Sequence, residues 1–112
     1  VLAALEENTD LLALLGGPYI YQLKAPEGLD KYITLFELTN FDSAWADNTA
    51  FMAEVHVQVD VWVKAASTSP IAAEVDKTMK SLGFKRTGSA DLYEDDTGIY
   101  HKALRYVTER EI

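Results

Sequence analysis

The 112-residue sequence contains no cysteine, only two histidines, and fewer basic than acidic residues. Without cysteine the chain has no disulfide bond, no thiolate metal site and no cysteine nucleophile. Ten lysines and arginines stand against 18 aspartates and glutamates, which gives a formal net charge of −8. Because proteins that bind nucleic acids or anionic membranes depend on clustered basic residues, this balance argues against both classes.

Long apolar runs are also missing, and none approaches the roughly 20 residues that cross a membrane. The leucine-rich start, residues 1–15, is interrupted by polar residues from Glu6 to Asp10, which a secretion signal does not tolerate. We therefore expect synthesis and residence in the cytoplasm. Two half-length domains would bury too little apolar surface, so residues 1–112 are predicted to form one domain.

The residue pattern predicts an α+β domain with the order α-β-β-β-α-β-β. Helices are predicted over residues 1–15 and 70–82, and strands over residues 19–23, 31–38, 51–64, 91–94 and 99–108, with residues 84–87 as a candidate for a further short strand. Thr9 and Asp10 could cap a second turn within the first helix. We expect a mostly antiparallel sheet of four to five strands with two helices packed on one face. Residues 39–50 are predicted to be a mobile loop, and residues 109–112 a frayed tail.

The segment from Phe51 to Lys64 has the clearest pattern, because apolar and mostly polar residues alternate along it without error. This period predicts one long strand with one buried face, on which Val57 and Val59 belong to the core. Fourteen extended residues span on the order of 45 Å, whereas a compact domain of this length is roughly 34 Å across. The strand must therefore bend or project, and Phe51 and Val63 near its ends are predicted to serve self-association.

Few residues form a plausible catalytic or metal site. Glu54, His56 and Asp60 share one face of the long strand and could hold a divalent metal, although an ordinary solvated strand face is favoured. A second group of acidic residues could attract a hard cation and comprises Asp91, Glu94, Asp95 and Asp96. A polar hairpin turn is the favoured interpretation of this group. Glycine-rich phosphate loops and the Gly-x-Ser-x-Gly elbow are absent. We predict no catalysis, no metal and no cofactor.

Aromatic residues in polar surroundings are the stronger signal, because such side chains often mark contacts with a partner. Phe41 and Trp45 lie in the predicted loop, and Met52 and Trp62 lie on the polar face of the long strand. For Trp62 a second layer of core beneath the first helix is an equal alternative.

Several segments resemble the tail-completion proteins of long-tailed phages and prophages, also called tail terminators or head-to-tail joining proteins. The alternating strand Val55–Val63, a short Ser/Thr linker and the helix Pro70–Leu82 resemble the central strand and second helix of that family. Further matching segments are Leu14-Leu15-Gly16-Gly17, Gly83-Phe84, Asp91–Asp95 and Tyr100–Tyr106. Val-Asp-Val-Trp together with the Tyr-His-Lys ending is the most specific part.

The resemblance implies a small α+β subunit that forms a ring, a hexamer in that family, on the end of the tail tube. Its implied partners are further copies of itself, the tail tube protein and the head connector protein, with no membrane. It implies a location in the virion tail, assembled in the host bacterial cytoplasm. The family brings no catalytic residues. DNA would pass through such a ring without specific binding.

A ring around the path of DNA gives the acidic residues a role. A negative lumen does not grip phosphates, so Asp91, Glu94, Asp95 and Asp96 are the first candidates to line or rim the channel. The alternative is that they face outward and keep the protein soluble.

Two other classes of function remain open from the sequence. One is a small-ligand-binding or enzymatic α+β dimer with a pocket between sheet and helices, for which His56 and Asp60 are the only candidate residues. The other is an adaptor module of a cytoplasmic assembly.

Overall fold

A computed structural model describes residues 1–46 and 49–111, with side chains described for residues 1–37 and 54–109. The helices are α1 (Leu2–Glu7), α2 (Thr9–Leu15) and α3 (Ser69–Ser81). The strands are β1 (Ile20–Gln22), β2 (Lys31–Ala46), β3 (Thr49–Lys64), β4 (Lys85–Glu94) and β5 (Ile99–Glu111). The predicted α+β class and element order are confirmed, except that the opening helix is divided in two.

The division occurs at Asn8, whose backbone is extended with φ −78° and ψ 97°. Its side chain caps α2, because Asn8 Oδ1 accepts a hydrogen bond from the Leu11 N–H at 3.1 Å. Asn8 Nδ2 donates to Thr78 Oγ1 at 2.9 Å, which joins the break to α3. The cap lies one residue before the Thr9-Asp10 pair that suggested a second turn.

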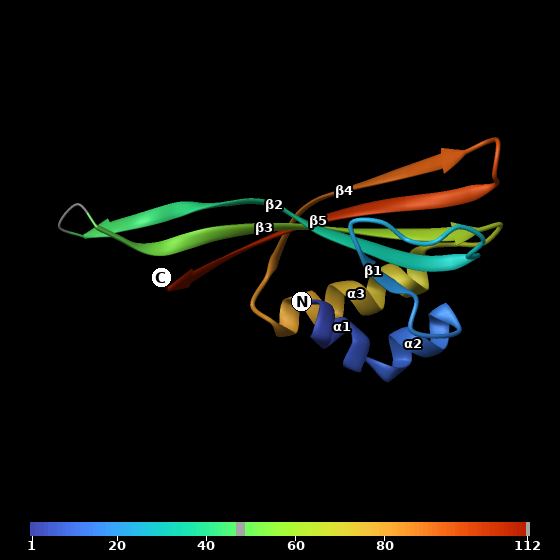
Figure 1. Cartoon of the computed structure of the whole chain (residues 1–112), viewed down its shortest axis with the longest axis horizontal. Helices are drawn as coiled ribbons and strands as arrows, with labels where there is room; N and C mark the ends of the chain where they lie inside the picture. The colour runs from blue at the N-terminus through green and yellow to red at the C-terminus, as the bar shows by residue number, and fades with distance from the viewer. Residues whose placement is uncertain (47–48, 112) are drawn as a thin grey trace.

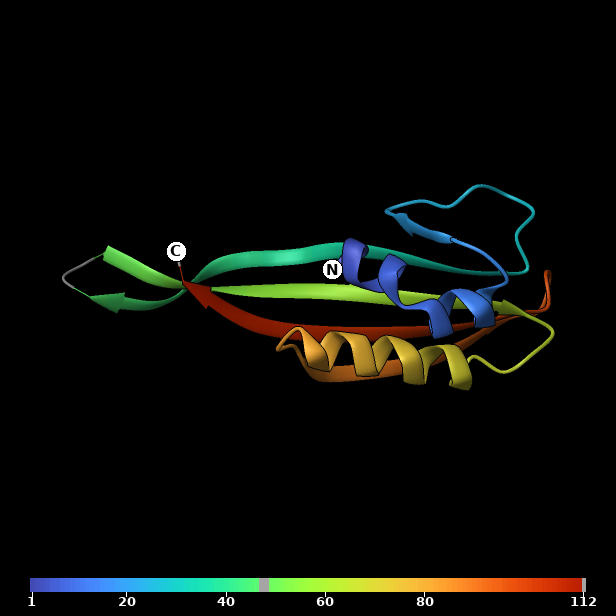
Figure 2. The same ribbon diagram turned by 90° about the horizontal axis from the view of Figure 1, so that it is seen from below.

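The five strands form one sheet in the order β1-β2-β3-β5-β4. β1 pairs with β2 in parallel, and the other neighbours are antiparallel. All three helices cover the same face of this sheet, and the opposite face carries no helix (Figures 1 and 2). We call the uncovered side the open face. Among the described residues, no helix has the length and apolarity needed to cross a membrane.

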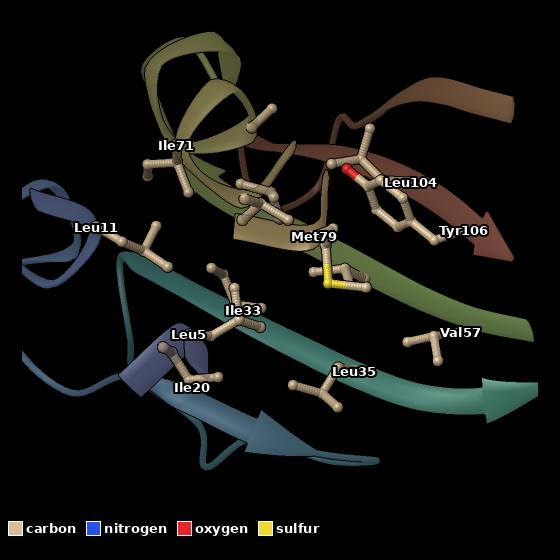
Figure 3. Packing of buried hydrophobic residues seen from close by; sticks show 14 of the residues in the cluster. Leu5, Leu11, Ile20, Ile33, Leu35, Val57, Ile71, Met79, Leu104 and Tyr106 are labelled. Atoms are coloured by element: carbon tan, nitrogen blue, oxygen red, sulfur yellow. The ribbon is translucent and has the colours of Figure 1, made fainter. Parts of the chain in front are cut away.

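The core fills the space between the helices and the covered face of the sheet (Figure 3). Val57 and Val59 are 5% and 0% exposed, which confirms their predicted place in the core. They pack with apolar residues of the helices and of three further strands: Leu5, Leu11, Ile20, Ile33, Leu35, Ile71, Val75, Met79 and Leu104. Tyr106 is also buried, and its hydroxyl donates to Asp76 Oδ1 at 3.0 Å.

The long strand projects from the helix-covered body. The molecule measures 54 × 29 × 22 Å, and β2 and β3 continue beyond the helices as an arm, which β5 accompanies as far as Met52 (Figures 1 and 2). The prediction of a loop over residues 39–50 is wrong, because β2 runs to Ala46 and β3 begins at Thr49. The predicted tail at 109–112 is wrong as far as Glu111, since β5 reaches that residue and pairs it with Met52.

Candidate functional site

The open face of the sheet carries a row of large side chains at the end of the body away from the arm. Tyr32, Trp62, His101 and Leu92 lie opposite one another on four successive strands. Trp62 is stacked between its two neighbours, with ring centroids 5.7 Å from Tyr32 and 3.7 Å from His101. Trp62 Nε1 also donates to Thr34 Oγ1 at 3.0 Å. We call these four residues the aromatic row.

The aromatic row changes the interpretation of Trp62. The alternative of a second core layer beneath the first helix is wrong, because this residue lies on the face opposite the helices. It remains partly exposed, so it is available to a partner. Partial burial and the charge of Glu94 raise the pKa of Tyr32.

Next to the row, a buried carboxylate is held by a chain of polar side chains. Asp60 is only 4% exposed and accepts a hydrogen bond from Gln58 Nε2 at 2.8 Å. Gln58 Oε1 in turn accepts one from Arg105 Nε at 3.1 Å. His101 Nε2 lies 3.4 Å from Asp60 Oδ1. Buried polar groups that are joined in this way fix one arrangement of side chains, so the network makes this part of the open face rigid.

In the sequence His101 has no acidic residue at strand spacing and would be a surface residue, whereas the structure places it beside Asp60. Its side chain is 14% exposed, and its Nε2 is buried next to Asp60 without a well-formed hydrogen bond among the described residues. Because this nitrogen is enclosed and Trp62 covers the ring, it cannot reach a substrate in solution. The sequence did not indicate this pairing, since it arises only from the register between β3 and β5.

The predicted metal constellation is divided between two places on the open face. His56 Nε2 contacts Glu54 Oε1, whereas the histidine beside Asp60 is His101. In the part of the chain that the structure describes, no three His, Cys, Asp or Glu side chains are grouped so as to hold a metal ion.

A groove of about 590 Å³ lies where the helical layer ends and the arm begins. It is lined by the start of α1, by Leu23 after β1 and by Phe84 after α3, with Leu35, Val55 and Val57 from the sheet. Glu37 is its only ionisable side chain among the described residues. A pocket that uses His56 and Asp60 is excluded, because both lie on the opposite face. Gln22 and Thr108 also line the groove, so polar side chains border an otherwise mostly apolar lining.

The four predicted channel acids do not form a single cluster. Asp91 lies on β4, where Lys102 Nζ is 3.1 Å from its Oδ1. Glu94 ends β4 and accepts a hydrogen bond from Thr97 Oγ1 at 3.2 Å, and Asp95 and Asp96 follow in the exposed turn before β5. The segment that carries these four acids lies at the end of the body that is farthest from the arm (Figure 1).

The predicted contact residues fall into three groups. Phe41 and Trp45 belong to β2, and Phe51 and Met52 to β3, all in the arm, but their side chains lie outside the described residues. Trp62 belongs to the aromatic row. Val63 is 0% exposed within the body, so its assignment as a contact residue is wrong: its side chain already belongs to the core of the single subunit.

The described residues thus form a subunit with a projecting arm and a rigid open face. Residues 1–108 match the family model described as tail completion protein gp17. The chain therefore belongs to the tail completion protein gp17 family, which makes it a structural protein of a phage-type tail, and the resemblance seen in the sequence is confirmed.

The fold agrees with a solved virion structure. The chain is similar to a protein chain in the virion of a native gene transfer agent particle, with a TM-score of 0.71 and 16% sequence identity. The match covers 98% of this chain and 90% of the other. At this identity the likeness concerns the fold. No curated protein matches the sequence significantly.

Proposed function

We propose that this protein caps the end of the tail tube and joins it to the head connector as a ring of identical subunits. The match of residues 1–108 to the tail completion family carries the proposal. The elongated shape supports it, because a subunit with an arm at one end and a body at the other makes head-to-tail contacts, which close into rings. Six copies are the number that the family resemblance implies.

The arm is the first proposed contact surface. Beyond the pair Met52–Glu111 the tip of the arm is a two-stranded ribbon without a covering layer, which is marginally stable by itself and gains from packing against another surface. Phe41, Trp45, Phe51 and Met52 in the arm sequence provide the apolar area for such packing. Trp62 and the aromatic row form a second, rigid contact surface on the open face.

The acidic turn is proposed to rim the channel through which DNA passes. Glu94, Asp95 and Asp96 are exposed at one end of the body, and only Asp91 of the four acids is paired with a lysine. Repeated around a ring, these carboxylates repel the phosphate backbone, so DNA slides past without specific binding. The role is structural, with no reaction assigned to the buried His101.

Deleting the coding sequence from the phage or prophage that carries it tests the function. Without the chain, tube growth would not be capped and heads could not attach to tails. Electron micrographs of induced lysates should therefore show full heads and separate tails. Expression of the chain in trans should restore joined particles. Joined, infectious particles made without the chain would overturn the proposal.

A further inference from the structure

The sheet has two free edges, and they lie on opposite sides of the molecule. β4 is the last strand on one side, and all ten of its residues are exposed. On the other side, β1 pairs with β2 only from Ile33 to Leu35, so from Phe36 to Ala46 the outer edge of β2 has no partner strand within the described residues (Figure 2). Each edge presents a line of backbone N–H and C=O groups that can pair with another chain.

We propose that β4 of one copy pairs with the arm strand β2 of the next copy, which makes the sheet continuous around the ring. The inference rests on the ring of the proposed function and specifies how that ring is held together. The occupant of each edge is therefore a second copy of this chain.

Strand polarity agrees with this pairing. β2, β3, β5 and β4 alternate in direction, so β4 runs antiparallel to β2 within one subunit. Rotation about a ring axis preserves the component of each strand along that axis, so strands that run mainly along the axis place β4 of one subunit antiparallel to β2 of its neighbour. Antiparallel pairing is the more stable of the two ladders.

The offset between neighbouring copies also agrees with a closed sheet. β1 blocks β2 at the level of the body, so β4 must pair four to six residues further along the arm. An even offset keeps side chains on matching faces. Four strands at about 4.8 Å advance about 19 Å per copy, and an offset of about 13–20 Å tilts the strands by about 35–46°, within the usual range of closed barrels.

The residues that would meet are compatible at the four-residue offset. Following the register across β5 and β3, Arg86 comes level with Asp42 of the next copy, and Leu92 with Phe36. Leu92 is 54% exposed in the single subunit, so an apolar neighbour would remove much of its area from water. The one like-charged pair, Asp91 with Glu37, is relieved by Lys102 beside Asp91.

The absence of native cysteine makes disulfide trapping a clean test. Ser89 of β4 is level with Leu35 and Val59, and the β2 residues that pair four and six residues further along β3, with Val55 and Ala53, are Asn40 and Asp42. Within one subunit β4 and β2 are three strand spacings apart, about 14 Å, which is too far for a disulfide. A disulfide in either double variant, Ser89→Cys/Asn40→Cys or Ser89→Cys/Asp42→Cys, can therefore form only between two copies.

The two double variants are expressed in place of the wild-type chain, and purified particles are oxidised and run on a non-reducing gel. One of them should give a ladder of covalent oligomers that ends in a closed ring. Ser89→Cys/Gln22→Cys is the matched control, since Gln22 of β1 is level with Ser89 and detects docking of β4 on β1 without an offset. The four single variants should stay monomeric on the gel.

Two outcomes would overturn the edge pairing and leave the proposed function standing. One is joined particles in which the cysteines at 40 and 42 remain free, and the other is a ladder from the Ser89→Cys/Gln22→Cys control. Joined particles that contain no copy of the chain would overturn the proposed function, and the edge pairing with it.

Discussion

Replacement of Trp62 by alanine tests whether the aromatic row holds the open face together. The change removes two stacked contacts and the hydrogen bond to Thr34 Oγ1. Each aromatic pair contributes about 0.5–1.5 kcal/mol beyond its buried area, and the hydrogen bond about 1 kcal/mol. Since the ring is partly exposed, we expect a loss of about 3 kcal/mol, at the low end of about 3–5 kcal/mol for buried aromatic residues.

Equilibrium unfolding in urea, followed by circular dichroism, measures this loss without relying on tryptophan fluorescence. Trp62→Phe keeps a ring between Tyr32 and His101 and loses only the N–H, so it should cost about 1 kcal/mol. Leu92→Ala, at the exposed end of the row, is the matched control and should change stability by less than about 0.5 kcal/mol. If Trp62→Ala were as mild as Leu92→Ala, Trp62 would be an ordinary surface residue and the reasoning would fail.

Four further predictions concern the core, an ion pair, the arm and the acidic turn. Val63→Ala should lower the free energy of unfolding by about 2 kcal/mol, because Val63 is fully buried. An unchanged urea midpoint would instead indicate that Val63 is a contact residue and not part of the core. Burial by itself raises the pKa of Asp76. Hydrogen bonds from Lys80 and Tyr106 and the nearby charge of Arg86 lower it by more, so the net pKa lies below the ordinary range. Its stabilising effect is present above the unfolded pKa of about 3.9 and is lost as pH falls through the folded value; Asp76→Asn should flatten acid denaturation there, and unaltered curves would contradict this. Trp45→Ala should leave the thermal midpoint nearly unchanged while reducing the yield of joined particles, whereas a loss of about 3 kcal/mol would place Trp45 in a core. Reversing Asp95 and Asp96 to lysine should slow DNA ejection without blocking assembly, and ejection at the normal rate would refute the channel-rim role.

Much of the fold could be predicted because its elements have regular periods. The long strand alternates strictly from Glu54 to Lys64, since its odd residues from Val55 to Val63 face the core, and α3 has a proline in its first turn. The sequence did not predict the extension of β2 to Ala46. Its register shifts after Glu37 and after Asp42, and each extra residue reverses the alternation that would have marked a strand.

The aromatic row was less predictable than the core. His101, Trp62 and Asp60 come together because β5 pairs with β3, although about 40 residues and a helix separate them along the chain. Nothing in the local pattern around His101 indicates that register. The edge strand β4 was predicted in two pieces for a different reason: all of its residues are exposed, so no apolar period marks it as one strand.

Cryo-electron microscopy of assembled tails tests the central claim most directly. The account predicts a single ring of this chain at the head-facing end of the tube, with neighbouring subunits joined through their arms and their acidic turns at the channel rim. A tube whose head-facing end is closed by another protein, with this chain elsewhere in the particle or absent from it, would contradict the account.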